Sequence, residues 1–304
     1  MHLKSMMLSD NSKIRSLNRD EQLLFLNAFD ITLDDYLKHY GENILNICLG
    51  EDDFKRKQRL YESYLKMRKD GYSVAAIIKK KDFYTSTFYV DENVLIPRPE
   101  TETLVEKALD EVKRINNSKL HDKNNEQVKI LDMCTGSGCI GISILKEAIK
   151  MGINISLTLS DISKDALNVS KINYKNIIAD RGKNEPLFIE GDLFQNIPKH
   201  KKFDIIVSNP PYIKDSDEDS LEIEVKREPR IALFGGNDGL DIIKRLINES
   251  VNHLNNNGVL AFEFGLGEEG DIDILLRKSF EKVSIVNDLT ERPRFAFGWR
   301  SVVK

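Results

Sequence analysis

Short apolar runs alternate with longer amphipathic segments over the last two thirds of the chain. The runs are rich in β-branched residues, and each is four to seven residues long, a pattern typical of buried parallel strands. They predict strands over residues 128–132, 155–160, 187–190 and 203–208. Between them, helical spacing of apolar residues predicts a helix over 164–179 and another with the apolar face Ile140, Ile142, Ile144, Leu145 and Ile149. This alternation indicates an α/β fold with a mainly parallel sheet.

The C-terminal part adds elements of a different kind. Its pattern predicts a strand over 258–264, a helix over 268–280 and two final strands near 283–286 and 294–299. The last two strands are expected to form an antiparallel hairpin on an otherwise parallel sheet. The sheet would then have seven strands.

The first 80 residues predict helices. Thr32 can cap a helix whose apolar stripe is Leu33, Tyr36, Leu37, Tyr40, Ile44 and Ile47. A second helix is expected over residues 52–70. Its outer face is basic, with Lys55, Arg56, Lys57, Arg59, Lys66, Arg68 and Lys69. That face is either a solvated surface or a docking site for an acidic macromolecule.

A β-hairpin is expected next, with strands over 83–90 and 94–96 around a turn at residues 91–93. Pro99 then opens a helix, and the polar stretch 116–127 is expected to be a surface loop. The chain is thus predicted to contain a helical domain over 1–82, a hairpin linker over 83–98 and an α/β domain over 99–304. The charged stretch 214–230 is either a lid or a solvated loop.

Composition mainly excludes other classes of protein. A chain of 304 residues with 40% hydrophobic and 31% charged residues is typical of globular proteins, and its net charge of −4 argues against extended nucleic-acid contact. We expect no membrane span, and residues 1–10 lack the apolar centre of a signal peptide. Cys48, Cys134 and Cys139 suit neither a disulfide framework nor a metal site, so a cytoplasmic protein without a metal is expected.

Candidate chemistry begins at Asn209, which follows the strand predicted over 203–208 and precedes Pro210, Pro211 and Tyr212. The prolines cannot extend the strand, so Asn209 is expected at the carboxyl end of the sheet, where such folds bind ligands. The Asn209 side-chain oxygen and the Pro210 carbonyl would present two acceptors to an –NH2 group. Tyr212 would offer a flat face to an amide or a base. The alternative is a rigid turn without a ligand.

A Gly-rich turn follows the strand predicted over 128–132 and consists of Cys134, Thr135, Gly136, Ser137 and Gly138. Glycines let the backbone approach a ligand closely, although they also allow close packing of a helix against a strand. The spacing matches neither the dinucleotide fingerprint nor a P-loop. Alone, the turn leaves both interpretations open.

Acidic residues follow the next two predicted strands. Asp161 lies at the distance from the Gly-rich turn at which an acid commonly binds both hydroxyls of a ribose. Asp192 is suited to accept from an exocyclic amine, and Leu193 to cover an adenine face. These features predict an adenosine ligand, and the amine clamp at Asn209 then predicts S-adenosylmethionine beside a nitrogen nucleophile.

Longer motifs resemble the release factor glutamine methyltransferases (HemK/PrmC). They are the segment 94–102 (Val-Leu-Ile-Pro-Arg-Pro-Glu-Thr-Glu), the stretches 131–138, 191–194 and 203–213, and the stretches 228–236 and 238–240. The resemblance runs from about Tyr72 to Trp299. Two positions depart from the family pattern: Cys134 stands where Gly is usual, and Leu193 where an aromatic residue is frequent. They put cofactor affinity in question rather than the type of reaction.

This resemblance implies a seven-stranded, Rossmann-like class I methyltransferase sheet with an N-terminal substrate-recognition domain. It further implies S-adenosylmethionine as cofactor and N5-methylation of the glutamine in the Gly-Gly-Gln tripeptide of class 1 peptide chain release factors, by a monomer that does not bind nucleic acid directly. The expected catalytic residues are Asn209, Pro210, Pro211 and Tyr212. The expected cofactor residues are Cys134, Thr135, Gly136, Ser137, Gly138, Asp161, Asp192, Leu193 and Asn209.

The residues themselves leave two other classes of function open. A nucleic-acid amino-methyltransferase acting on adenine N6 or guanine N2 needs the same amine clamp as a glutamine methyltransferase. The third class is a non-catalytic adaptor that only binds the cofactor.

Overall fold

The computed structural model describes residues 17–40, 42, 47–121, 126–178 and 185–300. The chain divides into two compact units, Met1–Lys79 and Lys80–Lys304, and each unit has its own hydrophobic core. In the described part of the chain, no helix is both long and apolar enough to span a membrane.

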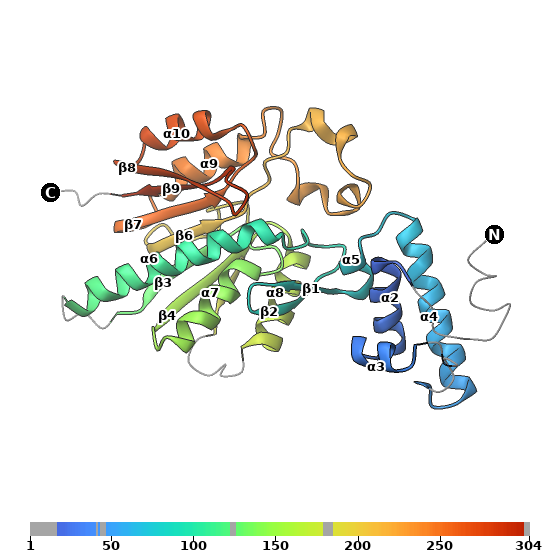
Figure 1. The fold of residues 1–304 in the computed structure, drawn as a ribbon. Helices are drawn as coiled ribbons and strands as arrows, with labels where there is room; N and C mark the ends of the chain where they lie inside the picture. Colours follow the sequence, from blue (N-terminus) through green and yellow to red (C-terminus); the bar gives the residue numbers. More distant parts are fainter. Residues whose placement is uncertain (1–16, 41, 43–46, 122–125, 179–184, 301–304) are drawn as a thin grey trace. The chain divides into compact units, whose positions relative to one another are not determined.

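The first unit is helical (Figure 1). Its described helices are α2 (Arg19–Phe29), α3 (Leu33–Lys38), α4 (Glu51–Lys69) and α5 (Val74–Ile78). They enclose a small aromatic core that consists of Leu24, Phe25, Ala28, Phe29, Tyr36, Tyr61 and Ile77.

The predicted apolar stripe after Thr32 is only partly right, because Tyr36 is in the core and Ile47 packs against it, but the other described positions are exposed. Thr32 does cap α3, because its hydroxyl accepts from the Asp35 N–H at 3.1 Å. The helix ends at Lys38, however, and only Tyr36 is buried, whereas Leu33, Leu37 and Tyr40 are 48%, 58% and 52% exposed. Glycine at position 41 favours the end of a helix, which the apolar spacing alone did not reveal. Ile44 lies outside the described residues.

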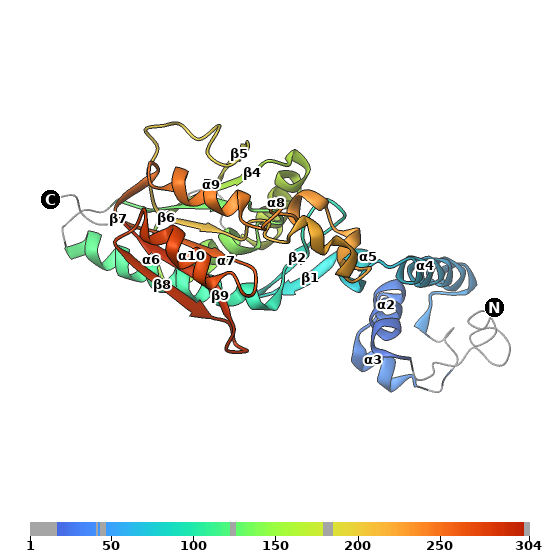
Figure 2. The same cartoon turned by 90° about the horizontal axis from the view of Figure 1, so that it is seen from above.

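The second unit opens with the hairpin, which lies earlier than predicted (Figure 2). Strands β1 (Lys80–Phe83) and β2 (Ser86–Tyr89) pair in antiparallel fashion across the turn at Tyr84 and Thr85. Tyr84 takes a φ of +54°, a conformation that Gly or Asn usually adopts, so this turn has no signal in the sequence. Asp91 does form a turn, because its side chain accepts from the Asn93 N–H at 3.0 Å, but no strand follows that turn.

A seven-stranded sheet forms the centre of this unit and confirms the predicted fold class. Its strands are β3 (Val128–Met133), β4 (Ile155–Asp161), β5 (Leu187–Glu190), β6 (Phe203–Ser208), β7 (Leu254–Glu263), β8 (Lys282–Asn287) and β9 (Pro293–Trp299). Their order is β5-β4-β3-β6-β7-β9-β8. Strands β3 to β7 run parallel, and β9 is antiparallel to both of its neighbours.

Helices cover both faces of the sheet (Figure 1). They are α6 (Glu102–His121), α7 (Cys139–Lys150), α8 (Lys164–Ile177), α9 (Asp241–Ser250) and α10 (Glu269–Arg277). Side chains of β3 alternate between two cores, since Ile130 packs with residues of α6 and α7, and Leu131 with residues of α9 and α10. With both faces buried, the functional groups gather at the strand ends.

The surface loop predicted over 116–127 is partly wrong, because α6 continues to His121. Lys119 explains the extra turns: its ammonium donates to the buried Asp204 carboxylate at 2.7 Å and to the Gln127 carbonyl at 2.9 Å. This tertiary contact outweighs the weak helix propensity of an Asn- and Lys-rich segment. Residues 122–125 lie outside the described part.

Candidate active site

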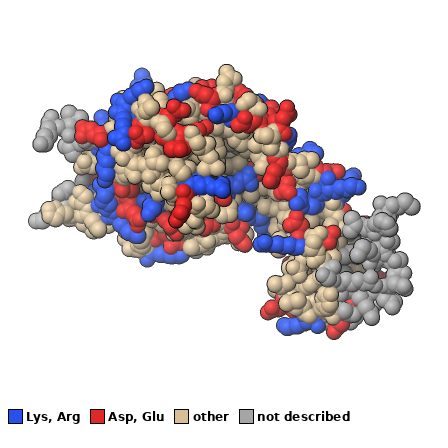
Figure 3. All heavy atoms as spheres, turned by 45° about the horizontal axis from the view of Figure 1, so that its top comes forward, with Lys and Arg blue, Asp and Glu red and all other residues tan. Residues whose placement is uncertain are grey.

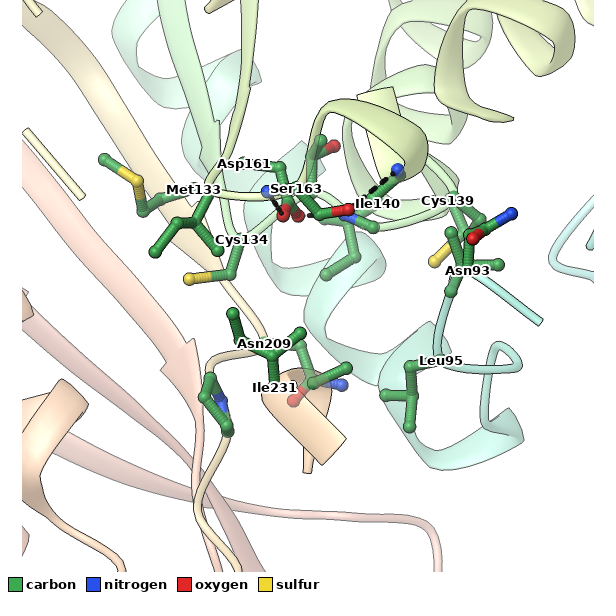
Figure 4. A pocket seen from close by; sticks show the side chains of 18 of the residues that line it. Asn93, Leu95, Met133, Cys134, Cys139, Ile140, Asp161, Ser163, Asn209 and Ile231 are labelled. Carbon is green, nitrogen blue, oxygen red and sulfur yellow. Dashed lines mark hydrogen bonds between the residues drawn. The ribbon is translucent and has the colours of Figure 1, made fainter. Parts of the chain in front are cut away.

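The polar residues predicted at the strand ends come together around one cavity (Figure 4). About 990 Å³ of space lies within its lining residues, and part of that space is open solvent. Figure 4 shows Asp161 and Cys134 across the cavity from Asn209 and Ile231. The predicted residues that line it are Cys134, Thr135, Gly136, Ser137, Asp161, Asp192, Leu193, Asn209 and Pro211.

The two glycines of the Gly-rich turn have different roles. Gly138 caps α7 at a φ of +80°, and a Cβ there would lie 2.6 Å from Ile142, so this glycine serves helix packing and does not line the cavity. At Gly136 (φ +54°) a Cβ would meet nothing within 4 Å, so the turn is open to the cavity at this point. Cys134 also has a positive φ, of 56°, which costs a non-glycine residue about 1–2 kcal/mol.

Backbone N–H groups hold Asp161 in place (Figure 4). Its Oδ2 accepts from the Gly136 N–H at 2.8 Å, and its Oδ1 accepts from the Ser163 N–H at 2.9 Å. Burial raises the pKa of the carboxyl, and these two donors oppose that rise. A carboxylate has about four acceptor positions, so Asp161 can still accept from two hydroxyls.

Asp132 supports the Gly-rich turn from behind, without lining the cavity, and the sequence interpretation did not single it out. It is fully buried at the end of β3, and its Oδ2 accepts from the Thr135 hydroxyl at 2.6 Å and the Gly141 N–H at 2.9 Å. Its Oδ1 has no partner among the described residues. Burial raises the pKa of this carboxyl to about 7. The carboxyl thus ties the Gly-rich turn to α7, and its signal in the sequence was a charge inside a buried strand.

Asp192 and Leu193 line the same cavity beyond β5. Leu193 is buried at a φ of +49°. The Asp192 carboxylate forms an ion pair with Arg245 at 3.1 Å, so one of its oxygens already has a partner.

Asn209 stands where this cavity meets a second one. The second cavity is lined by Pro210, Tyr212, Ile213, Leu221, Val225 and Leu233. Both cavities share Leu95, Arg98, Asn209, Pro211 and Ala232. The Asn209 Oδ1 is buried and has no partner among the described residues, whereas its Nδ2 lies 3.5 Å from the Thr101 hydroxyl.

Tyr212 is anchored by a second carboxylate that the sequence interpretation missed, Glu263 at the end of β7. The Tyr212 hydroxyl donates to the Glu263 Oε1 at 3.0 Å and accepts from the Arg294 Nη2, also at 3.0 Å. The Arg294 guanidinium lies 5.3 Å from the centre of the Tyr212 ring. Burial, and then the nearby Glu263 charge, raise the pKa of Tyr212 well above its usual value, so the phenol keeps its proton.

The charged stretch 214–230 is not irregular throughout. It contains the 3-10 helices η3 (Asp215–Ser220) and η4 (Val225–Arg227), and η5 (Arg230–Ala232) follows. Glu228 is its buried residue and accepts from the Arg98 Nη2 at 2.6 Å and the Ile96 N–H at 3.1 Å. The stretch is therefore fastened to the segment 94–102 beside both cavities.

The loop after Tyr212 is backed by a glycine that cannot be replaced without a shift. A Cβ on Gly235 would lie 2.7 Å from the Pro211 carbonyl oxygen and 2.3 Å from that of Gly239. The Gly235 N–H also donates to the Ile213 carbonyl at 2.9 Å. This close backbone packing explains the Gly-Gly pair at 235–236.

A parallel sheet that ends in an antiparallel hairpin, with a ligand cavity at its carboxyl edge, is the fold of the class I S-adenosylmethionine-dependent methyltransferases. In agreement, the family model "Methyltransferase small domain" matches residues 104–226. Among solved structures, a methyltransferase from Pyrococcus furiosus is 13% identical, with a TM-score of 0.45, and covers 71% of this chain and 89% of that chain.

Curated relatives narrow the class to one family. The release factor glutamine methyltransferase of Clostridium acetobutylicum is 39% identical over 79% of this chain and 79% of its own length. The same enzyme of Leptospira interrogans is 41% identical over 79% of each chain, and that of Bacillus cereus is 34% identical over 94% of this chain and 95% of its own length. The chain belongs to the release factor glutamine methyltransferase family.

Proposed function

We propose that this protein methylates the side-chain amide nitrogen of a glutamine, within the Gly-Gly-Gln tripeptide of a class 1 peptide chain release factor. The observation that carries the proposal is the Asn209 Oδ1, a buried acceptor without a partner among the described residues, in a residue that lines both cavities. A buried acceptor left unsatisfied costs about 1–3 kcal/mol. A substrate amide N–H donated from the second cavity removes that cost.

The first cavity fits S-adenosylmethionine. Gly136 leaves open space beside the turn, Asp161 presents oxygens suited to two ribose hydroxyls, and Leu193 provides an apolar surface for adenine. Asp192 lies beside Leu193 and can accept from the adenine amine, and residues 134–137 of the Gly-rich turn border the methionine end. The bound cofactor supplies a methyl group on a positively charged sulfur.

The residues around Asn209 position the substrate amide and do not act as general bases. The Asn209 Oδ1 and the Pro210 carbonyl accept the two hydrogens of the substrate amide and so direct its nitrogen towards the first cavity. Their negative ends also stabilise positive charge that develops on this nitrogen. Neither Tyr212 nor Glu263 serves as a base, because the phenol keeps its proton and Glu263 accepts from Thr101, Tyr212 and Arg294.

A protein substrate suits the charge of the molecule better than a nucleic acid does. The net charge is −4, and on the face shown in Figure 3 the acidic and basic residues of the described part are interspersed. Another relative, the ribosomal protein uL3 glutamine methyltransferase of Francisella tularensis, is 39% identical over 62% of this chain and 55% of its own length. Release factor and ribosomal protein therefore both belong in a substrate test.

We propose further that the enzyme acts as a monomer in the cytoplasm. Light scattering tests the oligomeric state, and cell fractionation tests the location.

The decisive experiment offers labelled S-adenosylmethionine together with release factor, uL3, tRNA, ribosomal RNA or DNA. We expect label only in the release factor, at the glutamine. Asn209→Ala should lower turnover ~100-fold or more, because an orienting contact is lost, while calorimetry shows cofactor binding weakened only modestly. Near-normal turnover of this variant contradicts the role of Asn209, and label in a nucleic acid contradicts the proposed substrate.

A further inference from the structure

A chain of buried polar side chains leads from the end of β7 to Asn209. Thr101 ends the short helix η2 (Pro99–Thr101), and its hydroxyl lies 2.6 Å from the Glu263 Oε2. The same hydroxyl oxygen lies 3.5 Å from the Asn209 Nδ2. Thr101 is 1% exposed and Glu263 is 0% exposed, so water does not compete for these contacts.

The direction of each hydrogen bond in this chain is determined by Glu263. A carboxylate only accepts, so the Thr101 hydroxyl donates its single proton to Glu263. The Thr101 oxygen then offers only lone pairs to Asn209. The amide group that faces it must be the Nδ2 donor, although the contact is long, and this leaves the Oδ1 pointing elsewhere.

Three donors on Glu263 keep it an acceptor. Besides Thr101, the Tyr212 hydroxyl donates to its Oε1 at 3.0 Å and the Arg294 Nη2 at 3.2 Å. Burial raises the pKa of this carboxyl, and the Thr101 hydroxyl and the Arg294 charge oppose the rise. Arg294 is the decisive partner, because a guanidinium cannot turn around and accept.

We propose that Thr101 and Glu263 are positioning residues that fix which way the Asn209 side-chain amide faces, with Nδ2 towards Thr101 and Oδ1 free for the substrate. Rotation by 180° about the last torsion of Asn exchanges its oxygen and nitrogen with almost no change in shape, so packing alone does not select one state. In the reversed state an –NH2 group would meet the –NH2 group of the substrate. The effect on glutamine methylation rests on the proposed function. The orientation of the Asn209 side-chain amide does not.

The orientation is measured first, in the intact protein without substrate. With 15N-labelled asparagine, the Asn209 –NH2 signals are identified by their loss in Asn209→Ala. We expect contacts from these protons to the Thr101 methyl group in the wild type, and loss of those contacts in Glu263→Gln. A glutamine there keeps its oxygen towards Arg294 and turns its –NH2 towards Thr101, which reverses the chain of donors. A wild-type protein without the Thr101 contact overturns the inference.

Turnover on release factor is measured next, with variants chosen to separate orientation from packing. Thr101→Val has nearly the same shape but no hydroxyl, and we expect its kcat to fall ~10-fold or more, as one orienting hydrogen bond is lost. Glu263→Gln should show a similar fall. Thr101→Ser keeps the hydroxyl and should restore kcat to within about twofold of the wild type. The KM for release factor and the dissociation constant of the cofactor should change little in each variant.

Thr103→Val is the matched control. Thr103 is buried two residues further on, and its hydroxyl has no partner among the described residues. The same substitution there should leave kcat unchanged. If Thr101→Val and Thr103→Val behave alike, or if Thr101→Ser does not rescue, the positioning role is wrong. If the wild type shows the expected orientation but does not methylate release factor, the proposed function fails and the orientation stands.

Discussion

Asp161 shows how one carboxylate can shape the turn and bind a ligand at the same time. Its two oxygens accept from the Gly136 and Ser163 N–H groups. In Asp161→Asn the amide nitrogen must face one of these donors, and the charge offered to ribose hydroxyls is lost. Hydrogen bonds to charged groups contribute roughly 1.5–3 kcal/mol, so the dissociation constant of S-adenosylmethionine should rise ~10-fold or more in calorimetry.

The control for this variant is Asp165→Asn. Asp165 lies exposed in the first turn of α8, close to Asp161 in sequence but not part of the cavity lining. We expect its cofactor affinity to equal that of the wild type. Unchanged affinity in Asp161→Asn as well would remove Asp161 from the cofactor site.

Asp132 should make stability depend on pH in an unusual direction for an acid. Its pKa in the folded protein is about 7, mainly because of burial, against about 3.9 in an unfolded chain. The folded state therefore binds this proton more tightly, so the stability it contributes is fully present below about pH 4 and is lost as the pH rises through 7. The slope approaches about 1.4 kcal/mol per pH unit for one proton.

Asp132→Asn isolates this contribution, because the other buried acids titrate in both proteins. We expect the wild type to lose free energy of unfolding relative to Asp132→Asn between pH 5 and pH 7, as measured by urea denaturation. Asp165→Asn should follow the wild type over the same range. Parallel curves for the wild type and Asp132→Asn would show that the Asp132 pKa is not raised.

Among the elements, the parallel strands were the most predictable from sequence. Strand β6 occupies the predicted residues 203–208, all of which are buried, and a strand buried on both faces must be largely apolar. Strand β5 also occupies its predicted residues 187–190, although it lies at the edge of the sheet with its first and last residues exposed. The strand ends then placed Asp161 and Asn209 at one edge. Apolar runs show where a strand lies and say nothing about contacts between distant segments.

The missed elements depend on such distant contacts. The turn at Tyr84 carries no turn-forming residue, and the last turns of α6 depend on the ion pair between Lys119 and Asp204, 85 residues away. Glu263 was missed for a similar reason. A lone Glu at the end of an apolar strand was visible, but its partner Thr101 lies 162 residues away in sequence. Pairings over such separations emerge only in the folded chain.

The contacts of the segment 94–102 indicate what its residues do in the folded chain. Its Ile96 N–H and Arg98 side chain bind Glu228 at one end, and its Thr101 binds Glu263 at the other. One short segment thus joins the charged stretch 214–230 to the end of β7, and Asn209 lies beside its Thr101. In our proposal, this segment, on which the family resemblance depended strongly, serves mainly to position Asn209.

At the scale of the whole molecule, the two compact units divide the work in our proposal. Every residue that lines either cavity comes after position 92, within the second unit. The first unit has its own aromatic core and a basic helix, α4. The domain boundaries predicted at 82 and 98 stay a proposal, and the hairpin, which begins at Lys80, belongs with the second compact unit. We infer that the first unit recognises the protein substrate.

The basic face of α4 is smaller than its sequence indicates. Lys55 pairs with Glu51, Arg56 and Lys57 pair with Asp53, and Arg68 pairs with Asp20. Among the described residues, no ion-pair partner is found for Arg59, Lys66 or Lys69, all of which are exposed. These three cations are therefore the ones free to bind acidic groups of a release factor.

A protein shortened to begin at Lys80 tests the division of labour. It keeps the hairpin, both cavities and the sheet, so it should bind S-adenosylmethionine with unchanged affinity. It should methylate intact release factor poorly, because binding energy from contacts remote from the glutamine is lost. A short Gly-Gly-Gln peptide cannot make those contacts and should be an equally weak substrate for both proteins.

Replacing Arg59, Lys66 and Lys69 together by Glu in the full chain should raise KM for release factor and leave the peptide reaction unchanged. Full activity of the shortened protein on release factor would show that the first unit is not needed for recognition, and loss of cofactor binding would show that the second unit does not fold alone.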